Sequence, residues 1–139
     1  MLIGSAVHSI DPKGRVVIPA KYRSDLGSTV YVTSGAGGCI RAYSETEFLK
    51  VLDKLRAGNA QMNILRRKIL ASAEQLNIDA QGRILIPESL RKAAGITDKM
   101  RMVGMIDWLE FWNEETMEKG EEELTPEQEL ALMAELGLA

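Results

Sequence analysis

The alternation of apolar and polar residues divides the chain into short strand-like runs separated by short helical segments. Apolar runs rich in β-branched residues occupy residues 16–18 and 84–86, and each follows another strand-like stretch, at residues 6–10 and 76–78. Proline follows each apolar run and glycine comes shortly afterwards, which frames a helix of about eight residues in both places. The pattern therefore predicts a β-rich α+β protein in which one unit occurs twice.

An internal repeat accounts for this pattern. Residues 10–27, IDPKGRVVIPAKYRSDLG, reappear 68 positions later as residues 78–95, IDAQGRILIPESLRKAAG, without a gap. Identical pairs include Ile10/Ile78, Asp11/Asp79, Gly14/Gly82, Arg15/Arg83, Pro19/Pro87, Arg23/Arg91 and Gly27/Gly95. Self-similarity of this kind indicates a duplicated unit. Because one unit of about 40 residues is too small to bury a core alone, we expect the two copies to pair within the chain.

Each copy opens with a tight turn. The first turn, Asp11-Pro12-Lys13-Gly14, has Asp at its first position, Pro at its second and Gly at its fourth. The second, Asp79-Ala80-Gln81-Gly82, repeats this pattern without the proline. Since strand-like stretches flank both turns, the pattern predicts a β-hairpin at the start of each copy.

The rest of each copy contains a second hairpin and a capped helix. Residues 29–33 and 39–43 flank a glycine-rich turn, and residues 100–105 and 108–112 are their counterpart. Ser44-Glu45-Thr46-Glu47 is a capping box that opens a helix, residues 63–73 predict another, and Thr125-Pro126 opens an amphipathic tail helix. We expect a first repeat at residues 5–57, a helical connector at 58–73, a second repeat at 74–117 and an acidic helical tail at 118–139.

The charge of the chain is unevenly distributed. Its 139 residues have an ordinary globular composition, with 45% hydrophobic and 27% charged residues and a formal net charge of −3. Residues 1–109 carry 16 basic and 10 acidic side chains, whereas residues 110–139 carry one lysine and ten glutamates. A basic body suits polyanions when its charge is focused on one face, and an acidic tail suits solubility or a basic partner.

Several classes of function are not expected. A single cysteine, Cys39, indicates a reducing compartment, and the chain lacks an apolar run of about 18 residues and a signal-peptide pattern, so we expect a cytoplasmic protein with no membrane contact. His8 is the only histidine, and Gly35-Ala36-Gly37-Gly38 lacks the lysine of a phosphate loop. We expect no catalytic residues, no metal and no cofactor, and hence no enzyme.

The arginine after each turn is the functional candidate. The spacing Asp-x-x-x-Arg puts Arg15 and Arg83 beside a turn glycine, where a guanidinium could reach a phosphate or the edge of a guanine. The alternative is an Asp-to-Arg ion pair that only braces the turn. A second basic cluster, residues 66–68, is either a solvated helix face or an auxiliary phosphate patch.

These two motifs, each followed by an apolar run, Ile-Pro and a short helix ending in glycine, resemble the MraZ family of bacterial regulators of the division and cell-wall gene cluster. The resemblance implies two tandem AbrB/MazE-like swapped-hairpin units that form an intramolecular pseudo-dimer with short flanking helices. It also implies a homo-oligomeric ring, with eight subunits expected, which binds repeated boxes in double-stranded promoter DNA and is associated with the nucleoid.

Carried over by position, the resemblance implies that Arg15 and Arg83 contact DNA, with Lys13 and Gln81 as neighbours. The remaining motif residues would shape the turns and orient the arginines; they are Asp11, Gly14, Asp79 and Gly82. The second copy departs from the first by having Ala80 and Gln81 in place of Pro12 and Lys13, which makes it less basic.

Two hypotheses of function follow. The first is a sequence-specific, double-stranded DNA-binding transcriptional regulator of the promoter region of the division and cell-wall gene cluster, including its own gene. The second is an antitoxin-like interaction module that binds a partner protein through its acidic C-terminal tail. The second copy of the motif favours the first hypothesis, because antitoxins of that type carry one unit per chain.

Overall fold

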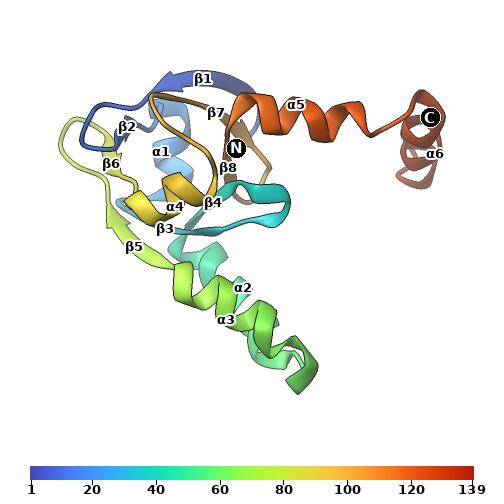
Figure 1. The fold of residues 1–139 in the computed structure, drawn as a ribbon, viewed down its shortest axis with the longest axis horizontal. Helices are drawn as coiled ribbons and strands as arrows, with labels where there is room; N and C mark the ends of the chain where they lie inside the picture. Colours follow the sequence, from blue (N-terminus) through green and yellow to red (C-terminus); the bar gives the residue numbers. More distant parts are fainter.

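The computed structural model describes all residues, 1–139, and shows an α+β fold in which the two repeats interleave (Figure 1). The first repeat contains β1 (Ser5–Ser9), β2 (Arg15–Val17), α1 (Ala20–Leu26), β3 (Thr29–Ser34), the 3-10 turn η1 (Ala36–Gly38), β4 (Ile40–Ser44) and α2 (Glu45–Ala57). A connector follows, made of η2 (Ala60–Met62) and α3 (Asn63–Ser72). The second repeat contains β5 (Glu74–Asn77), β6 (Arg83–Leu85), α4 (Glu88–Ala93), β7 (Lys99–Gly104), β8 (Leu109–Trp112) and α5 (Glu114–Glu122), and α6 (Pro126–Glu135) ends the chain.

Strands of one repeat pair with strands of the other. The main sheet has six antiparallel strands in the order β1-β7-β8-β4-β3-β5, and β2 and β6 form a separate two-stranded ribbon. Strand β1 of the first repeat lies against β7 of the second, and β5 of the second lies against β3 of the first. The fold is therefore a pair of tandem swapped-hairpin units within one chain.

The hairpin predicted at the start of each copy was wrong, because the strands are exchanged between the copies. Both turns form, but β1 and β2 do not pair with each other, and neither do β5 and β6. Exchange is favoured because it buries the apolar side chains of both copies in one core. Val16 of β2 and Ile84 of β6 are register partners, and both are 1% exposed.

The second hairpin of each copy forms as predicted. Strand β3 pairs with β4, β7 pairs with β8, and β4 and β8 pair with each other to join the two halves of the sheet. Side chains from both repeats then fill one core, which includes Ile18, Val30, Ile40, Ile86, Met102, Leu109 and Phe111. The core is continuous between the repeats, so neither repeat has one of its own.

The short helices begin one residue later than predicted. Pro19 and Pro87 keep extended ψ angles of 142° and 138° and so stand just before α1 and α4 instead of at their first helical positions. Their fixed φ still directs the chain into the helix. Tyr22 and Leu26 of α1 are buried, as is Leu90 of α4, so each helix covers the core with one face.

Helix α2 and the connector helix α3 form a helical hairpin beside the sheet (Figure 1). Ser44 caps α2 by accepting the backbone N–H of Glu47, and Phe48 stacks on Tyr31 with 4.6 Å between ring centroids. Arg66 of α3 donates from Nε to the Leu55 carbonyl over 2.8 Å and also binds the Gly58 carbonyl. Arg66 therefore closes the C-terminal end of α2, which the sequence pattern did not indicate.

The tail extends away from the sheet. Helix α5 leaves the edge of the body and α6 stands apart at its end (Figure 1), and residues 118–139 are exposed throughout. Asn113 caps α5 through the Thr116 N–H, and Thr125 and Gln128 form a reciprocal capping box at α6. None of the helices has both the length and the apolar character needed to cross a membrane.

The buried thiol of Cys39 supplies a first prediction. Burial, together with the nearby Glu110 carboxylate, raises the pKa of this thiol to about 12, so very little thiolate exists at neutral pH. We expect iodoacetamide at pH 8 to alkylate Cys39 about tenfold more slowly in the folded protein than in the urea-unfolded protein. Mass spectrometry measures both rates, and equal rates would contradict the burial of this thiol.

The shared core supplies a second prediction. Ile84→Ala removes buried side-chain volume from the core beneath β2 and β6, so we expect it to lower the free energy of unfolding by about 2–5 kcal/mol. Because both repeats depend on this core, urea unfolding should remain one transition for the whole chain. Leu49→Ala, at an exposed position on α2, is the control and should change stability by less than about 0.5 kcal/mol. Two separate transitions would show that the repeats fold independently.

Candidate nucleic-acid interface

The two-stranded ribbon of β2 and β6 has one inward and one outward face. Val16 and Ile84 point into the core, so their neighbours along each strand point outward. In the register, Arg15 lies opposite Leu85 and Val17 lies opposite Arg83. The outward face therefore presents two arginines and two apolar side chains in an arrangement related by a pseudo-two-fold axis.

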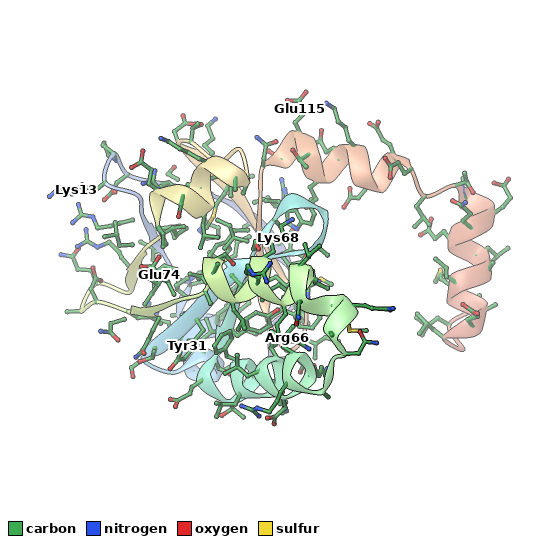
Figure 2. All side chains as sticks on the ribbon, turned by 60° about the horizontal axis from the view of Figure 1, so that its bottom comes forward. Lys13, Tyr31, Arg66, Lys68, Glu74 and Glu115 are labelled. Carbon is green, nitrogen blue, oxygen red and sulfur yellow. The ribbon has the colours of Figure 1, made fainter.

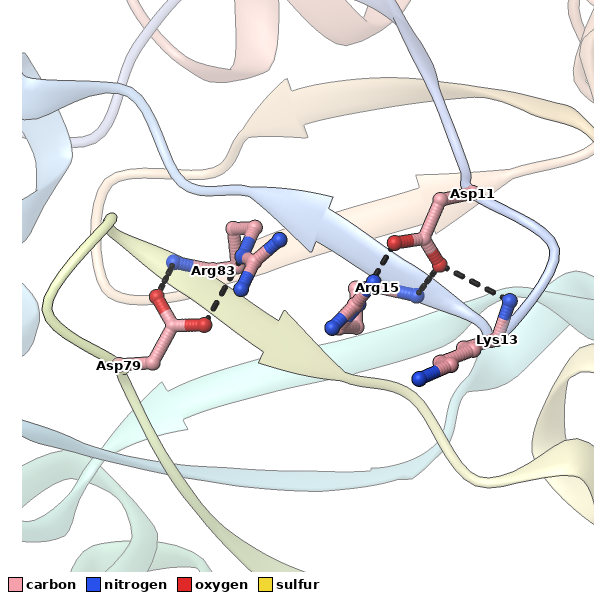
Figure 3. Close-up of polar contacts among 5 residues, drawn as sticks. All are labelled: Asp11, Lys13, Arg15, Asp79 and Arg83. Atoms are coloured by element: carbon pink, nitrogen blue, oxygen red, sulfur yellow. Dashed lines mark hydrogen bonds and ion pairs between the residues drawn. The ribbon is translucent and has the colours of Figure 1, made fainter.

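The first arm, residues 11–15, is closed by its aspartate (Figure 3). Asp11 Oδ1 accepts the backbone N–H groups of Lys13 and Arg15, at 3.0 and 2.8 Å. Asp11 Oδ2 accepts Arg15 Nε at 2.6 Å. The Gly14 N–H donates to the Asp11 carbonyl, and Gly14 has a φ of 94°, which only glycine adopts without strain.

The second arm, residues 79–83, repeats this geometry in every contact. Asp79 Oδ1 accepts the N–H groups of Gln81 and Arg83 at 2.9 and 2.8 Å, and Oδ2 accepts Arg83 Nε at 2.9 Å (Figure 3). Gly82 has a φ of 79°. The turn therefore does not need Pro12 or Lys13 of the first arm, because the aspartate and the glycine suffice to close it.

The Asp-to-Arg pair and a binding role are compatible. In both arms the aspartate engages only Nε of the guanidinium, and no hydrogen bond in the structure involves the Nη atoms of Arg15 or Arg83. A guanidinium carries five N–H donors, so four remain on each arginine. The aspartate fixes the direction of the side chain and leaves its terminal edge available for a phosphate or a base.

The two arms also hold each other in place. The Ile18 N–H donates to the Gly82 carbonyl at 2.8 Å, and the Ile86 N–H donates to the Gly14 carbonyl at 3.0 Å. Each turn is thus hydrogen-bonded to the strand end of the other repeat, so the spacing between the two arginines is set by the exchange of strands.

Two further arginines pack against the turns. The guanidinium of Arg91 covers Gly14 and that of Arg23 covers Gly82, so closely that an added Cβ would come within 2.8 and 2.7 Å of them. Arg91 Nε donates to the Ile86 carbonyl at 3.0 Å, whereas Arg23 Nε is buried without a partner. Sequence reasoning did not assign them a role. Arginine occupies this position in both repeats, and that identity could have indicated a role for Arg23 and Arg91.

The outward apolar residues were also missed. Val17 and Leu85 are 47% and 54% exposed, although each lies in a continuous apolar run, a pattern that predicts burial. The period of two along a strand is the signal that could have found them, because it places them on the arginine face. Of the predicted site residues, Lys13 and Gln81 lie exposed in the two turns, and the structure brings all the others together around the ribbon.

The turn geometry predicts how the two aspartates titrate. Hydrogen bonds to the carboxylates hold the pKa of Asp11 and of Asp79 below the ordinary value. The largest cause is the backbone N–H of Arg15 for Asp11 and the backbone N–H of Arg83 for Asp79. The stabilisation they give is therefore complete above the unfolded pKa of about 3.9 and is lost as the pH falls through the lower folded pKa. Carbon-13 NMR titration should place the midpoint of Asp11 below that in a peptide of residues 9–17, and the midpoint of Asp79 below that in a peptide of residues 77–85. Midpoints equal to those in the peptides would contradict the observed hydrogen bonds.

Comparisons with known proteins match both repeats of the chain. The family profile described as "MraZ protein, putative antitoxin-like" matches twice, at residues 1–67 and 69–135. A protein of Lachnoclostridium phytofermentans named Transcriptional regulator MraZ is 38% identical over 120 residues, which are 85% of each chain. Another of that name, from Acetivibrio thermocellus, is 36% identical over 99% of this chain and the whole of its own.

Among solved structures, the solution structure of PHS018 from Pyrococcus horikoshii covers 80% of this chain and 88% of its own, with a TM-score of 0.34 and 14% identity. The double match of the family profile falls on the two interleaved repeats, and the relatives align over most of the chain. With its duplicated arms and its shared core, this chain belongs to the MraZ family.

Proposed function

We propose that the protein is a sequence-specific, double-stranded DNA-binding transcriptional regulator. Its target is the promoter region of the division and cell-wall gene cluster, including its own gene, and it acts at the nucleoid in the cytoplasm. The observation that carries the proposal is the ribbon of β2 and β6, where Arg15 and Arg83 are fixed through Nε and keep their Nη atoms free. Relatives named as transcriptional regulators over nearly the full length of this chain support it.

The ribbon has the chemistry of a DNA-reading element. The major groove is about 12 Å wide and admits a two-stranded β-ribbon. An arginine with free Nη donors binds guanine O6 and N7 in a bidentate manner, and an apolar side chain contacts the methyl group of thymine. Arg15 with Leu85, and Val17 with Arg83, offer both kinds of contact at each end of the ribbon.

The turn residues flank this face. Lys13 is exposed in the first arm and suits a phosphate contact, whereas Gln81 occupies the corresponding position of the second arm as a neutral hydrogen-bonding group. Arg23 and Arg91, packed on the turns, add positive charge on both sides. The first arm therefore contributes more to phosphate binding than the second.

Several copies of the chain strengthen this binding. One ribbon reads only a short stretch of DNA, so a homo-oligomer that presents its ribbons to repeated boxes raises the effective concentration without new contacts. A closed ring, with eight subunits as the expected number, is the form we propose. Its arms would then engage successive promoter boxes.

Substitution of the ribbon arginines tests the proposal. Arg15→Ala should weaken binding to a duplex from upstream of the protein's own gene by about 1–3 kcal/mol, or roughly 5- to 150-fold, since each bidentate base contact is worth that much. Arg83→Ala should have a similar or smaller effect, because its arm is less basic. Fluorescence anisotropy with the native duplex and with a scrambled duplex measures both affinity and sequence preference.

Arg56→Ala provides a matched control. Arg56 is an exposed arginine on α2 that is paired with Asp53 and lies away from the ribbon, so its loss should leave the affinity unchanged. Circular dichroism shows whether each variant is folded. If Arg15→Ala and Arg83→Ala both bind the native duplex as tightly as the unaltered protein, the ribbon is not the DNA-binding site.

A further inference from the structure

The acidic tail, residues 118–139, has large apolar side chains that are exposed to solvent. The tail carries seven glutamates against one lysine, and α6 is a capped helix, not a loose end. Its large apolar side chains are between 37% and 74% exposed, and they are Leu124, Leu130, Leu132, Met133, Leu136 and Leu138. A single capped helix with this many exposed apolar side chains is typical of a segment that docks in a groove.

The α2–α3 cleft, a hollow of about 560 Å³, has the complementary shape and polarity. It lies between α2, α3, the η1 turn and the segment that leads into β8. Val51, Leu55, Leu65 and Ile69 line it with aliphatic surface, and the ring of Trp108 lines another wall. Leu65 is 56% exposed, so part of this apolar lining faces solvent.

Basic side chains border the cleft. Lys50, Lys54, Lys68 and Arg41 line it, against Glu47 and Asp107. Lys50 is paired with Glu47 at 3.0 Å, and Arg41 lies over the Trp108 ring at 4.6 Å. Lys54 of α2 and Lys68 of α3 take part in no ion pair, and Figure 2 shows Lys68 on α3. Two unpaired positive charges therefore stand beside an apolar hollow.

We propose that α6 of one copy docks in the α2–α3 cleft of a second copy. The apolar face of the helix, about 15 Å long for ten residues, would enter the hollow, and its glutamates would meet Lys54 and Lys68. Glu127 and Glu129 stand in the first turn of α6, opposite in charge to these lysines. The contact combines apolar burial with charge complementarity, which neither surface satisfies in the single chain.

The occupant is a second copy because α6 stands away from the cleft of its own chain. In both overall views the tail extends on one side of the sheet, while α2 and α3 lie on another (Figures 1 and 2). Helix α5 separates α6 from the body, so α6 is presented outward. A contact in which one copy uses its tail helix and the next copy uses its cleft is heterologous. Such contacts form a ring when the rotation from one copy to the next closes.

This inference does not rest on DNA binding. The ribbon of β2 and β6 contributes none of the residues that line the α2–α3 cleft. Loss of the tail contact should change the assembly state and leave the intrinsic affinity of one ribbon intact. The two proposals can therefore fail separately, because one is read from oligomeric mass and the other from binding to a short duplex with one box.

Charge reversal tests the contact in the full-length protein. Lys54→Glu with Lys68→Glu should raise the subunit concentration at which assemblies dissociate by at least about tenfold, since tenfold corresponds to 1.4 kcal/mol, a loss expected when favourable ion pairs become repulsive. Glu127→Lys with Glu129→Lys should have the same effect, and the fourfold variant should recover much of the assembly. Sedimentation velocity over a range of concentrations measures this, with Arg56→Glu on the outer side of α2 as the control.

Disulfide trapping identifies the occupant directly. Met133→Cys in one tagged chain and Leu65→Cys in a second, produced together in one cell, should form a disulfide-linked dimer on mild oxidation. Leu49→Cys replaces Leu65→Cys as the control, because Leu49 is 53% exposed on α2 and does not line the cleft. Cys39 is buried and stays outside this reaction.

Each outcome decides the proposal. Assembly lost on either charge reversal and recovered on their combination, with trapping at position 65 and not at 49, supports docking between copies. A further variant carries Met133→Cys and Leu65→Cys in the same chain. A disulfide that forms within this chain, with none between two chains, would overturn the second copy as the occupant. Unchanged assembly in all folded variants, or equal trapping at 65 and 49, would overturn the contact itself.

Discussion

The structure depends on the inability of either repeat to bury its own apolar residues. Each unit supplies only four short strands, and its turn sends the following strand away from the preceding one, so that β2 and β6 can pair with each other. Val16 and Ile84 are partners across this ribbon, and both are buried in the core that the two repeats share. Once β1 lies against β7 and β5 against β3, the two copies share one sheet and one core. The chain is therefore a pseudo-dimer by physical necessity.

The same exchange builds the site. Because β2 and β6 are antiparallel and in fixed register, Arg15 and Arg83 are held at opposite ends of one face. The aspartate of each arm uses its two oxygens for the turn and for Nε, so folding orients the arginines without occupying their terminal donors. Arg23 and Arg91 reach from one repeat to the turn of the other, which makes each arm dependent on both repeats.

Much of this was predictable from the sequence, and the reasons for the rest are physical. Turn residues, helix caps and strand runs are local signals, so the two arms, the second hairpins and the caps at Ser44 and Thr125 were predicted. Strand partners are chosen by the whole core, so local spacing predicted a hairpin where strands are exchanged, and the exchange was expected only from the family resemblance. The exposure of Val17 follows from the period of two along its strand, a signal that was available but not used. The use of Arg66 as a cap depends on a contact between α3 and the end of α2, which periodicity does not encode.

The central claim is that the ribbon formed by strand exchange is the surface that meets DNA. Amide hydrogen exchange, measured by mass spectrometry with and without a duplex from upstream of the gene, tests this in the unaltered protein. The account predicts that DNA slows exchange in residues 11–17 and 79–85 of both repeats and leaves α2 and α3 unchanged. Slowed exchange confined to α2 and α3, with none in either arm, would contradict it.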